Sequence, residues 1–234
     1  MRLFLASALL TALALPAIAA DPQTDEQKAF YALGAGMARQ LAPLQPFTPQ
    51  EIEFLSSGLS DSLQGKPLKA EPDAMAAKIR EIASTRSKAS AEVEKKKGQE
   101  FLEKAAKDKG AKKTESGLIY EEITPGTGDI PAATDTVKVN YRGTLIDGTE
   151  FDSSYKRNQP ATFPLNGVIK CWTEGVQLMK VGGKAKLICP SDIAYGDRGS
   201  PPTIKPGSTL VFEVELLSIE GKGGGENKGG GEKK

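Results

Sequence analysis

The sequence of 234 residues contains no histidine and only two cysteines. Without an imidazole, it cannot build the Ser-His or Cys-His arrangements that activate a nucleophile. Two cysteines alone do not supply the four Cys or His ligands of a usual structural zinc site. We therefore expect neither histidine-based catalysis nor a metal site, and no cofactor is predicted.

Charge of one sign and long apolar runs are also scarce. The net charge at pH 7 is +1, whereas nucleic-acid-binding domains carry a clear basic excess, so no nucleic-acid partner is expected. A long apolar run occurs only in "MRLFLASALLTALALPAIAA". Its early Arg2 and the A-x-A pattern at 17–19 predict a secretory signal peptide at residues 1–20. The run is short for a bilayer span, so we expect export and no membrane span after cleavage.

Export bears on the two cysteines, Cys171 and Cys189, because thiols in an oxidising compartment often pair. Their spacing is not that of a CxxC redox motif. We expect a disulfide that closes a short loop and stabilises the fold by about 3 kcal/mol. The alternative is two buried thiols. Cys171 directly precedes Trp172, the only tryptophan, which raises the question of which rare side chain carries a function.

The N-terminal part has helical patterns. Apolar side chains recur at helical spacing in two segments, namely Phe30, Leu33, Met37 and Leu41, and then Ile52, Leu55, Leu59 and Leu63. Thr48 and Glu51 form a capping box around Pro49, which predicts where the second helix begins. Two short amphipathic helices bury little surface alone, so residues 21–70 are expected to form a dimerisation domain. Packing against the chain's own later domain is the alternative.

Residues 71–113 are expected to form one long connecting helix that begins at Pro72. The apolar stripe of this segment ends near residue 83, and the remainder is rich in alanine, lysine and glutamate, which favour a helix but offer few anchors. The helix is therefore predicted to be a solvent-exposed spacer. Gly98 is expected to weaken it by about 1 kcal/mol relative to alanine and to mark a candidate bend.

From Gly117 onward the apolar period changes from 3.6 to 2, which is typical of strands. The segment "DTVKVNYRGTLIDGTEFDSS" predicts a hairpin that turns at Asp147-Gly148. The segments "GKAKLICP" and "STLVFEVELLSIE" predict two further strands. Residues 114–220 are therefore expected to be a small domain built on a sheet.

A single helix is expected to interrupt these strands, because Trp172, Val176 and Met179 form an apolar stripe at helical spacing. Several strands with one packed helix indicate an α+β domain. Residues 221–234 are rich in glycine and lysine, so they are expected to be a disordered tail.

The concentrated signal in this domain is aromatic. The glycines at 126–128 lack the Gly-Lys-Ser/Thr spacing of a phosphate-binding loop. Asp147, Glu150 and Asp152 have no second carboxylate motif to work with as a general acid and base. Many aromatic side chains in a small, half-open sheet can instead line an apolar pocket.

The chain contains three ordered segments, "VKVNYRGTLIDGTEFDSSYKRNQP", "VIKCWTEGVQLMKVGGKAKLICPSDIAYGDRG" and "TLVFEVELL". With them, residues 117–220 resemble the FKBP-type peptidyl-prolyl cis-trans isomerases. The signal, the paired helices and the long helix further resemble the macrophage infectivity potentiator (Mip) branch, whose members are exported homodimers. The resemblance implies an FKBP-like half-barrel, in which an antiparallel sheet wraps around one short helix. It also implies a prolyl isomerase that acts on proline-containing unfolded or partly folded polypeptides.

The resemblance implies a set of site residues. The expected catalytic residues are Tyr141, Phe151, Asp152, Ile169, Trp172, Tyr195 and Phe212. The expected substrate-binding and supporting residues are Arg157, Phe163, Val168 and Ile204. Among them, Trp172 is expected to be the pocket floor. Asp152 is expected to be a buried carboxylate held by Arg157. The Tyr195 hydroxyl and the Ile169 backbone N–H are expected to donate to the substrate carbonyl.

Such a pocket suits a chain without histidine, because rotation about a prolyl bond needs neither a nucleophile nor a proton carrier. We expect a periplasmic isomerase with chaperone activity, and outer-membrane or cell-surface association is the alternative location. A non-catalytic periplasmic holdase or a surface virulence or adhesion factor is the alternative function. Macrolide inhibitors are a further candidate ligand. Ala161 stands where many family members have an aromatic residue and Ser200 where a histidine is frequent, which bears on inhibitor affinity.

Overall fold

The computed structural model describes residues 21–221. The predicted signal at 1–20 and the predicted tail from residue 222 onward lie outside the described residues. The chain divides into two compact units between Gln40 and Leu41. None of the described helices is long and apolar enough to cross a membrane.

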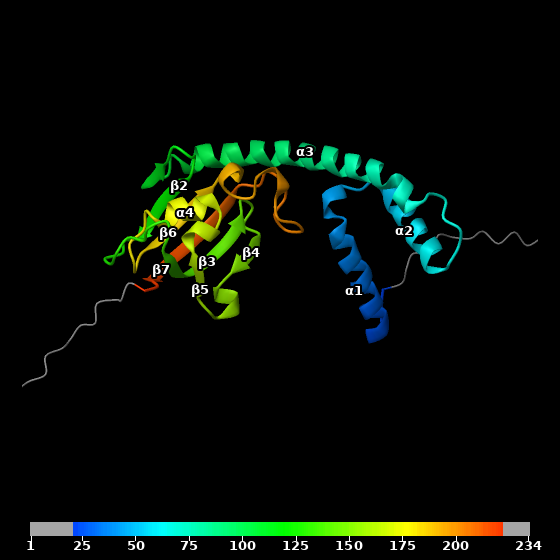
Figure 1. Ribbon diagram of the computed structural model, residues 1–234, viewed down its shortest axis with the longest axis horizontal. Helices are drawn as coiled ribbons and strands as arrows, with labels where there is room; N and C mark the ends of the chain where they lie inside the picture. The colour runs from blue at the N-terminus through cyan, green and yellow to red at the C-terminus, as the bar shows by residue number, and fades with distance from the viewer. Residues whose placement is uncertain (1–20, 222–234) are drawn as a thin grey trace, which may run out of the picture. The chain divides into compact units, whose positions relative to one another are not determined.

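The first unit consists of helix α1, Asp25–Gln40. The second unit begins with the short 3-10 helix η1, Ala42–Leu44, followed by α2, Pro49–Leu63, and α3, Pro72–Ala105 (Figure 1). The predicted helices therefore exist, with the starts of α2 and α3 at the expected prolines.

The start of α2 confirms the predicted capping box. The backbone N–H of Glu51 donates to Thr48 Oγ1 at 3.3 Å, and the backbone N–H of Thr48 donates to Glu51 Oε2 at 2.8 Å. These two bonds satisfy backbone donors that a helix start otherwise leaves unpaired. Arg86 of α3 adds an ion pair to Glu51 and donates to the carbonyl of Pro46 at 2.9 Å, which fastens the segment before α2 to α3.

Two predictions for the long helix were wrong. The helix ends at Ala105, and residues Ala111–Lys113 form strand β1, which pairs with β2. One face of its second half is covered, since Ala91, Gly98 and Ala105 are buried. These small residues recur every seven positions on one helical face, which lets other backbone segments approach closely. The helix runs unbroken through Gly98, so this glycine marks a close contact and no break.

One antiparallel sheet forms the body of the second unit, with the strand order β1-β2-β6-β7-β3-β4 and with β5 paired to β3. The strands after β1 are β2 (Ile119–Thr124), β3 (Thr136–Leu145), β4 (Glu150–Ser153), β5 (Ala161–Pro164), β6 (Lys184–Cys189) and β7 (Leu210–Ile219). The predicted hairpin joins β3 to β4. Gly148 has a φ of 86° at its turn, a conformation that glycine adopts without strain.

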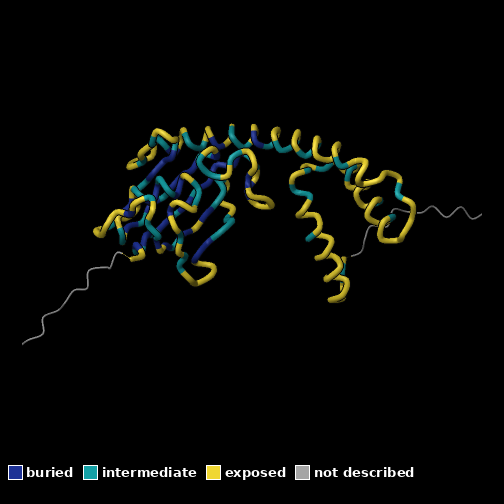
Figure 2. Tube along the Cα trace, viewed as in Figure 1, coloured by how far each residue is buried: buried dark blue, intermediate teal, exposed yellow. Residues whose placement is uncertain are grey.

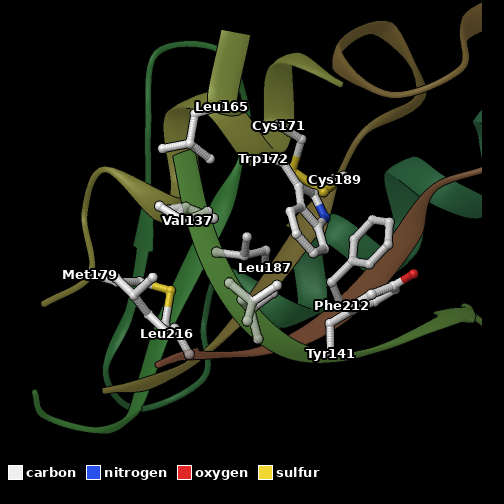
Figure 3. Packing of buried hydrophobic residues seen from close by; sticks show 14 of the residues in the cluster. Val137, Tyr141, Leu165, Cys171, Trp172, Met179, Leu187, Cys189, Phe212 and Leu216 are labelled. Atoms are coloured by element: carbon white, nitrogen blue, oxygen red, sulfur yellow. A yellow bond between two sulfur atoms is a disulfide. The ribbon is translucent and has the colours of Figure 1, made fainter. Parts of the chain in front are cut away.

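Helix α4, Lys170–Val176, packs against the sheet and closes the core (Figure 3). The close packing depends on Gly175, because a Cβ there would lie 2.8 Å from the side chain of Leu187 on β6. The helix is shorter than its predicted apolar stripe: Met179 lies beyond its end, yet is buried with 2% exposure. The α+β architecture, an antiparallel sheet around one short helix, is confirmed.

Candidate active site

A cavity of about 370 Å³ opens between the sheet and the start of α4. Its lining consists of Tyr141, Phe151, Asp152, Phe163, Gly167, Val168, Ile169, Trp172, Tyr195 and Phe212. All the residues predicted to be catalytic from the sequence are therefore brought together, along with Phe163 and Val168. They come from β3, β4, β5, β7, α4 with the turn before it, and the loop after β6.

Edge-to-face contacts between rings hold the walls of this cavity. The Trp172 ring centroid lies 5.2 Å from that of Tyr141, 5.6 Å from that of Phe163 and 5.4 Å from that of Phe212. All three pairs have interplanar angles between 86° and 89°. Each contact of this kind contributes about 0.5–1.5 kcal/mol beyond the burial of area. Trp172 is therefore the centre of an aromatic floor held by three ring contacts.

A disulfide fixes the helix that carries this floor. Cys171 and Cys189 are bonded, with a Cα–Cα distance of 5.8 Å, and both are fully buried. The predicted pairing is confirmed. The bond joins the first turn of α4 to the last residue of β6, directly beside Trp172. Cys171 thus has a structural role, and of the two rare neighbours Trp172 is the one that faces the cavity.

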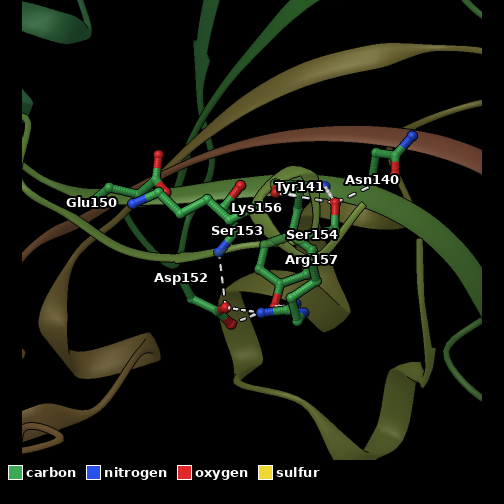
Figure 4. A network of polar contacts seen from close by, with 8 residues as sticks. All are labelled: Asn140, Tyr141, Glu150, Asp152, Ser153, Ser154, Lys156 and Arg157. Atoms are coloured by element: carbon green, nitrogen blue, oxygen red, sulfur yellow. Dashed lines mark hydrogen bonds and ion pairs between the residues drawn. The ribbon is translucent and has the colours of Figure 1, made fainter. Parts of the chain in front are cut away.

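The polar wall of the cavity is a network centred on Asp152 (Figure 4). The Tyr141 hydroxyl and the Arg157 guanidinium both donate to the Asp152 carboxylate. The backbone N–H of Ser153 donates to Asp152 Oδ1 at 2.8 Å, and Arg157 Nη2 donates to the Tyr141 hydroxyl at 2.9 Å. The carboxylate thus has three donors, which fixes its orientation toward the cavity.

This network determines the charge of the site. Partial burial works against the ionised form of Asp152, but the hydrogen bonds from Tyr141 and Arg157 outweigh it and hold the pKa of Asp152 below its usual range. Burial raises the pKa of the Tyr141 hydroxyl, and its bond to Asp152 raises it further. At neutral pH the network therefore consists of the Asp152 carboxylate, the neutral Tyr141 phenol and, behind them, the Arg157 guanidinium.

Asp152 was expected to be buried, and that prediction was wrong. Its side chain is 41% exposed. The reason is its position on β4, an edge strand that has only β3 as a neighbour in the sheet. The carboxylate accordingly sits at the mouth of the cavity, with one side toward solvent.

Three donors at the cavity have no acceptor among the described residues. The backbone N–H of Ile169, at the start of α4, makes no hydrogen bond there, and neither does the hydroxyl of Tyr195. Tyr195 is 40% exposed, so its hydroxyl is accessible at the rim. The indole N–H of Trp172 is buried and also lacks an acceptor within the described part of the chain. The cavity thus combines apolar walls with unused hydrogen-bond donors.

Comparison with known proteins assigns this chain to a family. Residues 128–217 match the family described as FKBP-type peptidyl-prolyl cis-trans isomerase, and residues 26–121 match the domain amino terminal to it. The FKBP-type peptidyl-prolyl cis-trans isomerase FkpA of Escherichia coli (strain K12) is 41% identical over 222 residues, which cover 88% of this chain and 82% of that protein. This chain belongs to the FKBP-type isomerases.

The similarity extends to solved structures and to a second branch. The crystal structure of FkpA from Escherichia coli has a TM-score of 0.64 and 41% sequence identity, covering 84% of this chain and 97% of that chain. The outer membrane protein MIP of Legionella longbeachae is 37% identical over 213 residues, which cover 84% of this chain and 87% of that protein. The resemblance deduced from the sequence is confirmed.

Two expected members of the FKBP site lie outside the cavity. Ile204 is 5% exposed, packs in the core, and borders a neighbouring cavity of about 460 Å³ instead. It lies in a tight loop, in which Ser200 and Ile204 pair through two backbone hydrogen bonds. Arg157 does not line the cavity either, but it holds Asp152 from outside, as expected.

The sequence reasoning missed two glycines of the FKBP site. Gly167 lines the cavity. Gly143 lies on β3 beneath two rings, and a Cβ there would come within 2.7 Å of Phe151 and 2.9 Å of Phe212. A glycine in the interior of a predicted strand signals such a close approach, so Gly143 could have been found from its position alone.

Proposed function

We propose that this cavity binds the proline ring of an X-Pro segment in an unfolded or partly folded polypeptide and accelerates rotation about its imide bond. The observation that carries the proposal is the pairing of an aromatic cavity with unused donors at its rim, Ile169 N–H and Tyr195 hydroxyl. The apolar floor suits a proline ring, and the donors suit the carbonyl oxygen of the substrate.

The mechanism follows from the electronics of the amide. Rotation has a barrier of about 18–20 kcal/mol because resonance makes the C–N bond partly double. Resonance also places negative charge on the carbonyl oxygen, so water stabilises the planar form. An apolar cavity removes that water, and the twisted imide loses less on transfer than the planar one. Preferential binding of the twisted form by only about 4 kcal/mol gives a thousandfold acceleration.

Each polar group has a defined part in this proposal. Tyr195 and the Ile169 N–H hold the carbonyl oxygens of the bound segment, which fixes one side of the rotating bond. The Asp152 carboxylate, oriented by Tyr141 and Arg157, faces the imide. No proton is transferred at any step, so the reaction does not require a group that titrates near neutral pH.

A protease-coupled prolyl-peptide assay tests the function. We expect Phe151→Ala and Asp152→Ala to lower kcat/KM by about tenfold or more, since either removes a contact worth at least about 1.4 kcal/mol in the transition state. Tyr155→Ala, which removes an exposed ring outside the cavity, is the matched control. Folded wild-type protein with no rate above background would refute the isomerase proposal, and full activity in both variants would refute the assigned site.

We further propose chaperone activity, carried by the same apolar cavity acting on unfolded chains. The non-catalytic holdase is the competing function, and the two separate in one experiment. Suppression of client aggregation by wild-type protein that lacks measurable isomerase activity would favour the holdase. Loss of both activities in Phe151→Ala would favour a single shared cavity.

For assembly, we propose a homodimer formed through residues 21–70. Neither α1 nor α2 has a buried residue in the described chain, and most of their residues are exposed (Figure 2). The exposed residues with large apolar side chains are Phe30, Tyr31, Leu33 and Met37 on α1 and Ile52, Phe54, Leu55, Leu59 and Leu63 on α2. Isolated short helices of this kind need a partner surface, and a second copy supplies one. Sedimentation of the mature protein with and without residues 20–70 tests this. The same number of chains per particle in both proteins would refute the proposal.

For location, we propose export to the periplasm by the signal at residues 1–20. The support is the sequence pattern of that segment, with Arg2 before the apolar run. Surface association is the alternative, because the similar protein of Legionella longbeachae is named an outer membrane protein. Mass measurement of the native protein tests cleavage, and cell fractionation separates a periplasmic from a surface-bound pool.

A further inference from the structure

One rim of the cavity belongs to a long connection. The connection between β6 and β7 spans residues 190–209. We call its second part, residues 195–209, which begins at Tyr195, the rim loop. Outside the short 3-10 helix Gly196–Arg198, most of the loop lacks regular structure. Long connections of this kind are mobile unless other parts of the molecule hold them. The position of the Tyr195 hydroxyl therefore depends on what fixes the rim loop.

The rim loop is first closed on itself at its base. The backbone N–H of Gly207 donates to the carbonyl of Gly196 at 3.0 Å, and the N–H of Gly199 donates to the carbonyl of Tyr195 at 3.1 Å. The two ends of the loop are thus tied together directly beside Tyr195. The position of Gly207 therefore constrains that of Gly196, the neighbour of Tyr195.

Helix α3 then holds this base. Gly207 lies against the helix backbone, where a Cβ would come within 2.9 Å of the Cα of Ala91. Two turns further along, Gly98 faces Thr209, and a Cβ on Gly98 would overlap with the Thr209 hydroxyl and lie 3.1 Å from its Cβ. Ala91 and Thr209 are 2% and 4% exposed, so the contact excludes water.

A charged contact lies between these two points on the same helical face. Lys95 Nζ lies 2.6 Å from Asp197 Oδ1 and 4.0 Å from Asp192 Oδ1. Asp197 is in the short helix that directly follows Tyr195. Lys95 therefore contacts the rim loop at Asp197, two residues after Tyr195.

We propose that α3 is a positioning element of the isomerase site, in which Lys95 and the Ala91–Gly98 face hold the rim loop so that the Tyr195 hydroxyl meets the substrate carbonyl. The inference rests on the proposed isomerase function. It assigns to the helix a part in catalysis beyond linking domains, although α3 contributes no residue to the cavity lining.

The test is a charge reversal in the full mature chain, with Lys95→Glu against Lys96→Glu as matched control. Lys96 is the exposed neighbour, so both variants make the same change of charge on the same helix. We expect Lys95→Glu to lower kcat/KM in the prolyl-peptide assay by about threefold, the size of an exposed ion pair, while Lys96→Glu stays at the wild-type rate. Lys95→Arg is expected to keep the rate, and the exchange Lys95→Glu with Asp197→Lys to recover it.

A double-mutant cycle separates positioning from a general loss of stability. In the Tyr195→Phe background the hydroxyl is absent, so Lys95→Glu should cost no further activity if it acts through that hydroxyl. An equal loss in both backgrounds, or equal rates for Lys95→Glu and Lys96→Glu in an active wild-type protein, would overturn the inference alone. An inactive wild-type protein would overturn the proposed function as well, which distinguishes the two failures.

Discussion

The sheet domain and the N-terminal helices treat the same kind of residue in opposite ways. In the sheet domain, apolar side chains such as Leu187 and Val214 are fully buried, and even the aromatic cavity residues are packed ring against ring. In α1 and α2, Phe30 and Leu63 are 67% and 79% exposed. Burial of apolar area is the main favourable term in folding. The sheet domain therefore carries its own stability, whereas the helices leave apolar side chains exposed that a partner surface can bury.

The two ends of α3 show the same contrast within one helix. Near its start, Met75 and Ile79 are more than 40% exposed, at 43% and 44%. Further along, small residues are buried against the sheet domain. Large apolar side chains near the start of α3 are thus exposed, whereas small side chains further along are covered. Close packing in the covered part depends on the small size of these residues.

The largest expected effect tests the self-sufficient core. Leu187→Ala removes a fully buried side chain beneath Gly175 of α4, so we expect the free energy of unfolding to fall by about 3 kcal/mol, whatever the protein concentration. Leu59→Ala, at 43% exposure in one chain, is the counterpart on α2. Its effect should appear as a weaker dimer, measured by sedimentation and by unfolding at two concentrations. A concentration-dependent loss in Leu187→Ala would break the contrast.

The disulfide is the next test of that core. Replacing both Cys171 and Cys189 by serine opens a loop with a sequence separation of 18. Unfolding should become easier by about 3 kcal/mol in the chain-entropy treatment. Since the bond fixes the start of α4, we expect prolyl isomerase activity to fall. The fluorescence of Trp172, which lies next to Cys171, should change as well. Denaturant unfolding of wild-type protein with and without reductant is the control, and equal stabilities there would contradict the expectation.

Local signals made much of this molecule predictable. Thr48 and Glu51 specify a helix start within four residues of sequence, and Asp147-Gly148 specifies a hairpin in the same way. The alternation around Tyr141 on β3 places its ring on the inner face, so the aromatic cavity followed from period and family pattern. These features depend on neighbours in the chain, which a sequence displays directly.

What failed depended on distant neighbours. Gly98 has no hydrophobicity to indicate burial, and its partner Thr209 lies in the rim loop, far along the chain. The exposure of Asp152 depends on β4 being an edge strand, and Ile204 is buried in a tight loop outside the cavity lining. Sheet order and loop path are tertiary properties, so residue type alone does not report them.

Gly98→Ala sharpens the contrast within α3 at a smaller scale. Alanine in place of glycine in a helix interior normally stabilises by about 1 kcal/mol, and Gly58→Ala in α2, where nothing lies within 4 Å, should show that gain. At Gly98 the new Cβ overlaps with buried Thr209, so we expect a loss of about 1–2 kcal/mol instead. Thermal unfolding of both variants measures the sign. Stabilisation by Gly98→Ala would show that the rim loop yields easily.

The smallest expected effect concerns Asp152, which lies at the mouth of the cavity with a half-exposed side chain. Its pKa is lowered in the folded state, with partial burial opposing the shift and the bonds from Tyr141 and Arg157 producing it. An unfolded chain therefore binds this proton more readily. The stabilisation is fully present above the ordinary aspartate pKa of about 3.9 and is lost as the pH falls through the lower folded value.

Asp152→Asn should flatten the acid side of the stability profile, measured by denaturant unfolding from about pH 2 to pH 6. Asp129→Asn, which removes an exposed carboxylate outside the network, is the control. Equal profiles for the two variants would mean that solvent at the half-exposed carboxylate screens the network completely, and that the Asp152 wall resembles the exposed helices more than the core.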